Sequence, residues 1–302
     1  MEIEVIKNRI DFHDLALIPA VTLNEMESVF SAREKEGRRL PIEPEGIQER
    51  IDPVLSLSSA RSIFVAFEQI PFSERLPESK PGYGRLAGVS RDRDYHDLLG
   101  EKLKKLEEYL NQNYPNVKTY CQVDTGPLYE RGFASLTGKG FIGRSGNFIH
   151  HILGSYVTIG LLVTNLSGGE LKIQRNRCGD CNRCVLACPG GALSDQGIVN
   201  PVRCRSWITQ KRGDLSEWEQ DIMGDWLYGC DICQMVCPKN RRIEKKFQVE
   251  EPMERIRLDD IRKTSNRTFK KQFGRLSGSW RGAKQWKKNA DYIDAYFRKD
   301  KR

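Results

Sequence analysis

Four cysteines that lie close together in the sequence have a spacing that can hold iron–sulfur clusters. They are separated by two, two and three residues, and a proline follows the last: Cys178, Cys181, Cys184, Cys188 and Pro189. Thiolates are soft ligands, and three of them spaced by two residues can wrap one corner of a 4Fe-4S cluster, while the fourth points away. The fourth cysteine is therefore expected to bind a second cluster.

The other ligands of a second cluster come from a later part of the chain. Cys204 is followed by the run Cys230-x2-Cys233-x3-Cys237-Pro238, so eight of the nine cysteines match two 4Fe-4S clusters. Their assignment follows the ligand crossing of two-cluster ferredoxins. One cluster takes Cys178, Cys181, Cys184 and Cys237, and the other takes Cys188, Cys204, Cys230 and Cys233. The alternative is two four-cysteine zinc sites, which ordinarily use separated pairs rather than a dense run.

The composition is that of an ordinary soluble globular protein. The chain has 302 residues, of which 38% are hydrophobic and 30% are charged, enough for two or three domains with a sizeable core. The first residues have mixed charge and no apolar signal region, and no stretch of eighteen apolar residues follows. Clustered free thiols indicate metal binding in a reducing compartment. We therefore expect a cytoplasmic protein that does not enter a membrane.

The net charge of +8 is unevenly distributed. Residues 262–302 contain fourteen Lys and Arg against three Asp, a net charge of +11, so the rest of the chain is slightly acidic. A basic segment of this kind indicates a polyanionic partner. A solvated helical face that aids solubility is the alternative.

Hydrophobic periodicity and turn residues predict the main elements. Helices are expected at 23–30, 98–111 and 128–137, with one or two more between 269 and 288. Strands are expected at 60–67, 117–123 and 156–164, of which the first and last are buried, with a turn-rich loop at 81–88 and a domain boundary at 165–170. The glycines between 138 and 146 match the dinucleotide fingerprint, but they follow a predicted helix, so we interpret them as a loop approached closely by a ligand or another element.

Four residues outside the cysteine runs are candidates for a site. Asp124 directly follows the predicted strand 117–123, and α/β proteins place chemistry at the carboxyl ends of strands. Capping the next helix is the equal alternative for this aspartate. Tyr95 and His96 lie beyond a loop that could line a site, or they are packing and cap residues. Arg50 fits a surface cation on spacing alone. Cys121, the ninth thiol, is expected in the core of its strand.

The combination of these motifs resembles the epoxyqueuosine reductase family. The resemblance rests on the segment 123–131 (Val-Asp-Thr-Gly-Pro-Leu-Tyr-Glu-Arg), on the glycine loop, on both cysteine runs and on 229–234 (Gly-Cys-Asp-Ile-Cys-Gln). It implies an oxidoreductase related to reductive dehalogenases, which reduces the epoxide of epoxyqueuosine in the tRNA wobble position to queuosine with cob(I)alamin. The implied fold is α+β or α/β. It has a cobalamin-binding α/β domain at 1–169, a ferredoxin-like domain at 170–245 and a basic helical segment at 246–302.

The resemblance also implies residue roles and partners. Asp124 would be the proton donor, and the cobalamin contacts would be Arg50, Tyr95, Asp124, Ser206, Trp207 and Asp231. The expected partners are the anticodon stem-loop of a tRNA and an external electron donor, for a monomeric enzyme. Predicted tRNA contacts are Lys270, Lys271, Lys284 and Lys287, or else the arginines Arg205, Arg212, Arg241 and Arg242. Trp280 and Trp286 are candidates for stacking, with buried packing as the favoured alternative for each.

The sequence departs from the family pattern at several places. The Asp-x-His-x-x-Gly segment that gives a histidine to cobalt in other corrinoid enzymes is absent. The glycine loop continues as Arg144-Ser145-Gly146, and Ile159-Gly160-Leu161 stands where the family has Leu-Gly-Glu. Helical repeats usually follow in the family, whereas this sequence ends at Arg302. One rival interpretation is a dehalogenase-like corrinoid enzyme that acts on a small molecule. The other is a plain electron carrier, which would not need the long segment before the cysteines.

Overall fold

The computed structural model describes residues 2–73, 75–241, 243–247 and 252–299. These residues form two compact units that exchange segments of the chain. The first unit contains residues 1–69, 96–181 and 242–246, and the second contains 70–95, 182–241 and 247–302. No helix in the described ranges has the length and apolar character needed to cross a bilayer.

The first unit is built on a four-stranded sheet. Its strands are β1 (Asp14–Pro19), β2 (Ser62–Gln69), β7 (Val157–Thr164) and β4 (Thr119–Val123), in that spatial order. Every neighbouring pair is antiparallel. The predicted strands 60–67, 117–123 and 156–164 are confirmed, but none of the neighbouring pairs in this sheet is parallel. The parallel-sheet argument for chemistry at the end of β4 is therefore wrong here.

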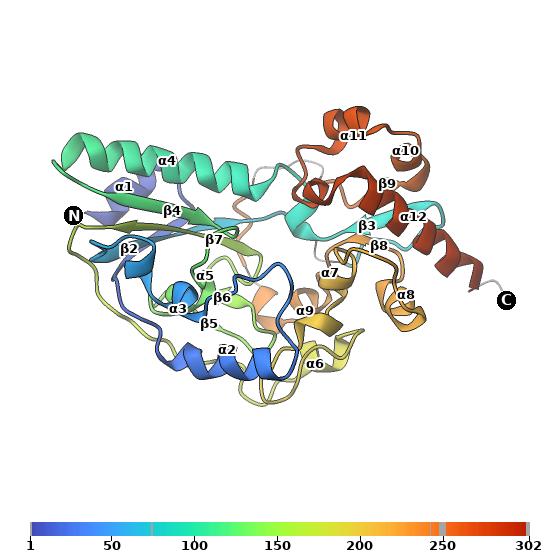
Figure 1. Ribbon diagram of the computed structural model, residues 1–302, viewed down its shortest axis with the longest axis horizontal. Helices are drawn as coiled ribbons and strands as arrows, with labels where there is room; N and C mark the ends of the chain where they lie inside the picture. The colour runs from blue at the N-terminus through green and yellow to red at the C-terminus, as the bar shows by residue number, and fades with distance from the viewer. Residues whose placement is uncertain (1, 74, 242, 248–251, 300–302) are drawn as a thin grey trace. The chain divides into compact units, whose positions relative to one another are not determined.

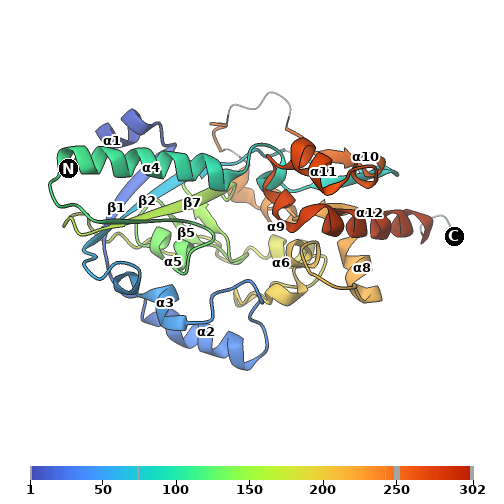
Figure 2. The ribbon, with the colours of Figure 1, turned by 45° about the horizontal axis from the view of Figure 1, so that its top comes forward.

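Helices cover both faces of this sheet (Figures 1 and 2). One face carries α1 (Ile3–Ile10) and α4 (Tyr95–Asn113), and the other carries α2 (Glu25–Lys35), α3 (Ile47–Ile51) and α5 (Glu130–Ser135). All eight positions of β2 are buried, because its alternate side chains enter two different cores. Phe64 and Ala66 join the core under α4, whereas Ile63 and Val65 join the core against α2 and α5.

The glycine-rich segment forms a hairpin rather than an irregular loop. Its strands are β5 (Gly140–Ile142) and β6 (Phe148–His150), paired antiparallel. A Cβ on Gly140 would lie 2.3 Å from the carbonyl oxygen of Ile149. The expected close approach is confirmed, and another strand makes it.

The second unit contains a three-stranded sheet and most of the short helices. The sheet order is β8 (Trp226–Tyr228), β3 (Tyr83–Leu86) and β9 (Arg255–Arg257), with β3 parallel to β8 and antiparallel to β9. The prediction of a loop at 81–88 was wrong in part, because strand pairing with distant segments overrides the local turn residues. The predicted domains 1–169, 170–245 and 246–302 differ from the observed division, since β3, β8 and β9 each come from a different one of them.

The remaining helices lie in the cysteine-bearing and C-terminal parts of the chain. They are α6 (Arg183–Ala187), α7 (Arg205–Ile208), α8 (Glu217–Met223), α9 (Ile232–Met235), α10 (Leu258–Arg262), α11 (Asn266–Phe273) and α12 (Gly282–Lys299). Short 3-10 turns are η1 (Pro53–Leu55), η2 (Gly88–Ser90), η3 (Pro201–Arg203), η4 (Pro238–Asn240) and η5 (Ser277–Arg281). The predicted helices at 23–30, 98–111, 128–137 and 269–288 are confirmed as α2, α4, α5, α11 and α12.

The two tryptophans of the basic segment have different environments. Trp286 on α12 is fully buried, with its ring 5.2 Å from that of Phe269, and its Nε1 donates to the carbonyl oxygen of Gly278 at 2.9 Å. Trp280 is 53% exposed. The packing role favoured for Trp286 is therefore confirmed, since its ring fills the core of the second unit, whereas Trp280 remains a candidate for stacking.

Candidate functional site

Asp124 lies on an exposed turn at the end of β4. Its φ is 56°, a left-handed conformation that few residues other than glycine adopt and that aspartate tolerates. Its side chain is 62% exposed. The next helix, α5, has Tyr129 as its N-cap residue, so Asp124 does not cap that helix. The capping alternative from the sequence is wrong, and the carboxyl group of Asp124 faces outward from the turn.

Two side chains close the loop between β4 and α5. The backbone N–H of Asp124 donates to Glu130 Oε1 at 2.6 Å. The buried Gln122 donates from Nε2 to Glu130 Oε1 at 3.2 Å and to the Leu128 carbonyl at 2.8 Å, and its Oε1 accepts from Leu128 N at 3.0 Å. Gly126 is required in this loop, because a Cβ there would lie 2.1 Å from Gln122 Oε1.

Glu130 differs electrostatically from an ordinary surface glutamate. Burial and, after it, the negative charge of Asp124 raise its pKa to about 8, although the hydrogen bonds from the Asp124 backbone and Gln122 act in the opposite direction. Glu130 lies in the segment that carries the family resemblance, but the sequence reasoning did not identify it. Its position six residues after Asp124, at the start of the predicted helix, was the available signal.

His96 brings an imidazole to the same turn. It lies in the first turn of α4, and its Nε2 is 3.3 Å from Asp124 Oδ2. Its side chain is 28% exposed, so the pair is accessible to solvent. The structure thus places His96 beside the predicted proton donor.

Arg50 is buried in the first unit and is not the surface cation that spacing favoured. Its Nη2 lies 3.1 Å from Glu43 Oε2, and its guanidinium lies over the Phe30 ring, 3.7 Å from the centroid. The Arg50 carbonyl oxygen accepts from Tyr129 N at 2.8 Å. Arg50 therefore ties α3 to the end of the Asp124 loop through its backbone.

The other predicted cobalamin contacts belong to the second unit. Asp231 is buried and accepts from Gly88 N at 2.7 Å and from Arg91 Nη2 at 3.3 Å. Burial raises its pKa, and the charge of Arg91 acts against that. Trp207 on α7 is buried, whereas Ser206 and Tyr95 are half-buried. The six predicted contacts come from both units, since Arg50 and Asp124 belong to the first.

Four of the predicted cluster ligands lie together in the second unit. The pKa of Cys233 is raised by burial and then by the neighbouring thiols of Cys230, Cys204 and Cys188. Burial also raises the pKa of Cys230 to about 12, although Arg205 beside it acts in the opposite direction. These four cysteines are the ones assigned to one cluster. A thiol surrounded by thiols in a buried place suits a metal-bound thiolate, whose charge the metal compensates.

The four cysteines fit a 4Fe-4S cluster in other respects too. All are free thiols, and Cys188 Sγ accepts from Ala192 N at 3.2 Å, a kind of bond that tunes iron–sulfur clusters. Among the described side chains, no three His, Cys, Asp or Glu converge on a position for a single metal ion. Each thiolate of a 4Fe-4S cluster binds a different iron, so its ligands need no common point.

Arg144 organises the start of the first cysteine run. Its backbone N donates to Cys178 Sγ at 3.3 Å, its Nη1 donates to the Cys181 carbonyl at 2.9 Å, and its Nη2 donates to the Gly179 carbonyl at 2.9 Å. The sequence marked this residue only as a departure from the family pattern. Its function as a clamp could not be read from spacing, because the three contacts join segments more than thirty residues apart. Cys178 and Cys181 belong to the first unit, whereas Cys184 and Cys237 belong to the second.

Cys121 is exposed, so its predicted place in the strand core is wrong. It lies on β4, at the edge of the four-stranded sheet, where only Gln122 of the strand is buried.

Some Lys and Arg side chains of the basic segment are exposed, whereas others form hydrogen bonds or ion pairs within the fold. Lys287 Nζ donates to the Thr264 carbonyl at 2.5 Å, and Lys288 Nζ donates to the Lys211 carbonyl at 2.9 Å. Arg262 pairs with Asp294 at 2.6 Å. The exposed cations among the described residues of this segment are Lys263, Arg267, Lys270, Lys271, Arg275, Lys284, Arg298 and Lys299. Lys301, Arg302 and the predicted contact Arg242 lie outside the described residues.

Within this segment, an arginine covers the exposed tryptophan. The Arg281 guanidinium lies 3.8 Å from the centroid of the Trp280 ring, and Trp280 Nε1 donates to the Tyr228 hydroxyl at 3.1 Å. Arg281 Nε and Nη2 find no hydrogen-bond partner within the described part of the chain. The neighbouring Arg212 adds positive charge, and burial together with that charge lowers the pKa of Arg281.

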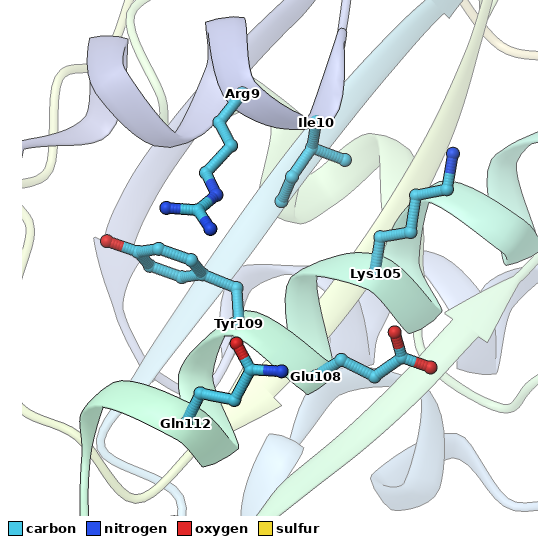
Figure 3. A pocket seen from close by; sticks show the side chains of 6 residues that line it. All are labelled: Arg9, Ile10, Lys105, Glu108, Tyr109 and Gln112. Atoms are coloured by element: carbon cyan, nitrogen blue, oxygen red, sulfur yellow. The ribbon is translucent and has the colours of Figure 1, made fainter.

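A small open hollow of about 210 Å³ lies between α1 and α4 (Figure 3). It is lined by Arg9, Ile10, Lys105, Glu108, Tyr109 and Gln112, with the Arg9 guanidinium 5.2 Å from the centroid of the Tyr109 ring. None of the predicted site residues lines this hollow.

Two family models match the sequence. One, described as epoxyqueuosine reductase QueG, DUF1730, matches residues 50–125, which end just after Asp124. The other, described as a 4Fe-4S double cluster binding domain, matches residues 177–240 and contains all eight predicted ligands. The second match supports two 4Fe-4S clusters over the zinc alternative.

Individual proteins give the same result. The epoxyqueuosine reductase of Listeria monocytogenes is 39% identical over 262 residues, which are 84% of this chain and 69% of that protein. A crystal structure of an epoxyqueuosine reductase with an epoxyqueuosine-modified tRNA-Tyr stem loop matches with a TM-score of 0.91 and 34% identity, covering 98% of this chain and 80% of that one. The Bacillus subtilis enzyme, with its catalytic aspartate loop swung out of the active site, matches with a TM-score of 0.90 and 32% identity, covering 97% and 81%.

Proposed function

The chain belongs to the epoxyqueuosine reductase family, and we propose that it reduces the epoxide of epoxyqueuosine at the tRNA wobble position to the alkene of queuosine. The observation that supports this most is the match over 98% of the chain to a reductase bound to an epoxyqueuosine-modified stem loop. Removal of the epoxide oxygen consumes two electrons and two protons. The enzyme therefore needs an electron path and a proton source.

The cysteines provide the electron path in this proposal. Cys188, Cys204, Cys230 and Cys233 would hold one 4Fe-4S cluster, and their grouping in one buried place supports this assignment. Cys178, Cys181, Cys184 and Cys237 would hold the other. An external donor would deliver electrons singly. Free thiols and a tRNA substrate support a cytoplasmic enzyme, and we propose that it acts as a monomer.

Cobalamin, when bound, would supply a strongly reducing cobalt centre for the epoxide. We propose that the accessible side chains of Tyr95, Ser206 and Asp124 would contact it directly. The side chains of Asp231 and Arg50 are already engaged by Arg91 and Glu43, and Trp207 is buried. Asp231, Arg50 and Trp207 would therefore shape the surface that contacts cobalamin and hold the backbone of that surface in place, rather than bind cobalamin through their own polar groups.

Asp124 provides the proton in this proposal. Its carboxyl group stands on a turn that faces solvent, so a substrate can reach it, and His96 Nε2 lies 3.3 Å from Oδ2. A protonated imidazole at this distance could return a proton to Oδ2 after each transfer. The loop fixed by Gln122 and Glu130 would keep Oδ2 directed toward the substrate.

The tRNA would be bound through the exposed cations of α11 and the start of α12. Lys270, Lys271 and Lys284 are exposed and suited to phosphate contacts. Trp280 is held at its Nε1 and is 53% exposed, which suits stacking with an unpaired base, and the Arg281 guanidinium over its ring adds positive charge.

The test is a turnover assay with anaerobic, cluster-reconstituted, cobalamin-loaded protein. The substrate is tRNA that carries epoxyqueuosine, a chemical reductant supplies electrons, and the nucleosides are separated and identified after digestion. Queuosine should appear in proportion to enzyme and time. Absence of queuosine with fully loaded protein, together with reduction of a small organohalide, would favour the dehalogenase-like alternative.

A further inference from the structure

We propose that Glu130 is a positioning residue for the reduction, which holds the Asp124 backbone in its left-handed turn and acts electrostatically on its carboxyl group. The inference rests on the proposed function, since Asp124 is the proton donor there. Glu130 itself stays behind the turn and acts only through Asp124. The role follows from the contacts, the charge and the shape of the loop.

The first argument is the backbone anchor. A residue with a Cβ is strained at a φ of 56°, so the turn persists only where its surroundings hold it. The 2.6 Å bond from Asp124 N to Glu130 Oε1 is the side-chain contact that fixes this peptide unit. Without an acceptor at residue 130, the amide would be free to rotate and the aspartate would lose its direction.

The second argument is that Glu130 is itself held in place. Gln122 donates to the same Oε1 at 3.2 Å and to the Leu128 carbonyl, and accepts from Leu128 N. The loop is thereby closed at both ends, by a buried amide on β4 and a carboxyl group on α5. Gly126 lets the chain pass over the amide, because any larger residue would collide with Gln122.

The third argument is the charge of the pair. Among the residues that the structure describes, the charged or titratable groups that act on Glu130 are Asp124, Tyr120 on β4 and Arg131 on α5. Burial and the charge of Asp124 raise the pKa of Glu130 to about 8. Because the interaction of two carboxyl groups is mutual, the ionisation of Glu130 changes the negative charge that the Asp124 carboxyl group faces. Proton donation by Asp124 should therefore depend on the ionisation of Glu130 near pH 8.

Two substitutions separate the anchor from the charge. Glu130→Gln keeps an oxygen that can accept from Asp124 N but removes the charge, whereas Glu130→Leu removes both. Glu108→Gln on α4 is the matched control, because it neutralises an exposed glutamate outside the site. Folding of each variant is checked by circular dichroism and iron content.

Hydrogen–deuterium exchange tests the anchor without any substrate. Peptides that contain Asp124 should stay protected in wild type, in Glu130→Gln and in the control, and should exchange faster in Glu130→Leu. Unchanged protection in a folded Glu130→Leu protein would overturn the anchoring role. If Glu130→Leu fails to fold, Glu130→Asp replaces it, because its shorter side chain cannot reach Asp124 N. Faster exchange in Glu130→Asp would then support the anchoring role, and unchanged exchange would overturn it.

Single-turnover rates with epoxyqueuosine-containing tRNA test the effect on the reaction. Glu130→Leu should lose about 10²-fold in rate with little change in KM for tRNA, since a misdirected acid slows chemistry rather than binding. Glu130→Gln should retain most of the rate but lack the inflection near pH 8 that the raised pKa of Glu130 predicts for wild type. Identical pH profiles of wild type and Glu130→Gln would overturn the electrostatic role. If wild type itself makes no queuosine, the proposed function fails, and the exchange result still decides the anchor.

Thermal unfolding gives an independent check of the charge. Because the pKa of Glu130 is raised in the folded state, this side chain stabilises the folded protein fully below about pH 4.5. That contribution to stability is lost as the pH rises through about 8. Glu130→Gln has no such loss. Its Tm relative to wild type should therefore rise across this pH window, while the Tm difference of Glu108→Gln stays constant. A constant difference for Glu130→Gln as well would overturn the electrostatic role.

Discussion

The Asp124 loop and the cysteine segments carry the two halves of the proposed chemistry, and they are built in different ways. In the loop, the residues that fix Asp124 are sequence neighbours, between Gln122 and Glu130, joined by hydrogen bonds of 2.6–3.2 Å. The thiols of Cys188, Cys204, Cys230 and Cys233 instead come from separate segments and meet in one buried place. One site is local in sequence, and the other is assembled.

The difference affects how each site can be recognised. A thiolate is a ligand by its own chemistry, so its identity and spacing are informative even when its partners are far apart in sequence. A carboxyl group becomes a proton donor only through its surroundings, because burial, neighbouring charges and hydrogen bonds decide when it holds a proton. The local site was therefore the harder one to interpret, although all its parts lie within one short segment.

The largest effect should come from the carboxyl group that the loop presents. Asp124→Asn should lower the single-turnover rate about 10²- to 10⁴-fold, because the amide is nearly isosteric but cannot deliver a proton. Iron content and tRNA affinity should stay unchanged. The control is Asp11→Asn, since Asp11 is also a left-handed aspartate, with φ 68°, but caps the end of α1.

A rate for Asp124→Asn close to that of Asp11→Asn would contradict the role of Asp124. The Asp124 loop would then have only a structural role, and the chemistry of the protein would rest on the cysteine segments alone.

A smaller effect is expected when the charge of the basic segment is reversed. Replacement of Lys270, Lys271 and Lys284 by Glu should weaken tRNA binding and lower the salt slope by about one for each lost phosphate contact. The rate at saturating tRNA should not change. Lys287 is left intact, because its bond to the Thr264 carbonyl is internal. The reversal of the exposed Lys104 and Lys105 on α4 is the control.

Filter binding or fluorescence anisotropy at several salt concentrations measures this effect. If the salt dependence of tRNA affinity is unchanged in the triple variant, these lysines only form a solvated face. The tRNA contact would then be expected at Arg281 and Arg212. Trp280→Ala then tests the stacking surface, with loss of affinity as the expected outcome.

The smallest change in a measured quantity concerns the assembled site. Cys204→Ala should lower the iron content of reconstituted protein from about eight to about four per chain, because a cluster with three thiolates is labile. Cys121→Ser should keep the full content, since Cys121 is exposed and lies apart from the cysteine runs. Elemental analysis and acid-labile sulfide measure both. Full iron in Cys204→Ala would show that this segment does not contribute a ligand.

The sequence by itself determined the elements whose pattern repeats locally. The helix α4 shows apolar residues at helical spacing, and β2 and β7 are continuous apolar runs, so each was predicted close to its observed bounds. The cysteine runs were recognised for the same reason, as spacing within a few residues reflects ligand geometry. The family itself could be identified from the order of these motifs.

Only the tertiary structure decided which groups are buried and which distant segments meet. The turn-rich segment at 81–88 became β3, because β8 and β9 supply its hydrogen bonds. Trp280 and Trp286 look alike in sequence, yet one is exposed and the other fills a core. Burial and the charge of Asp124 raise the pKa of Glu130 to about 8. Burial and long-range pairing depend on residues far along the chain, and no local pattern contains that information.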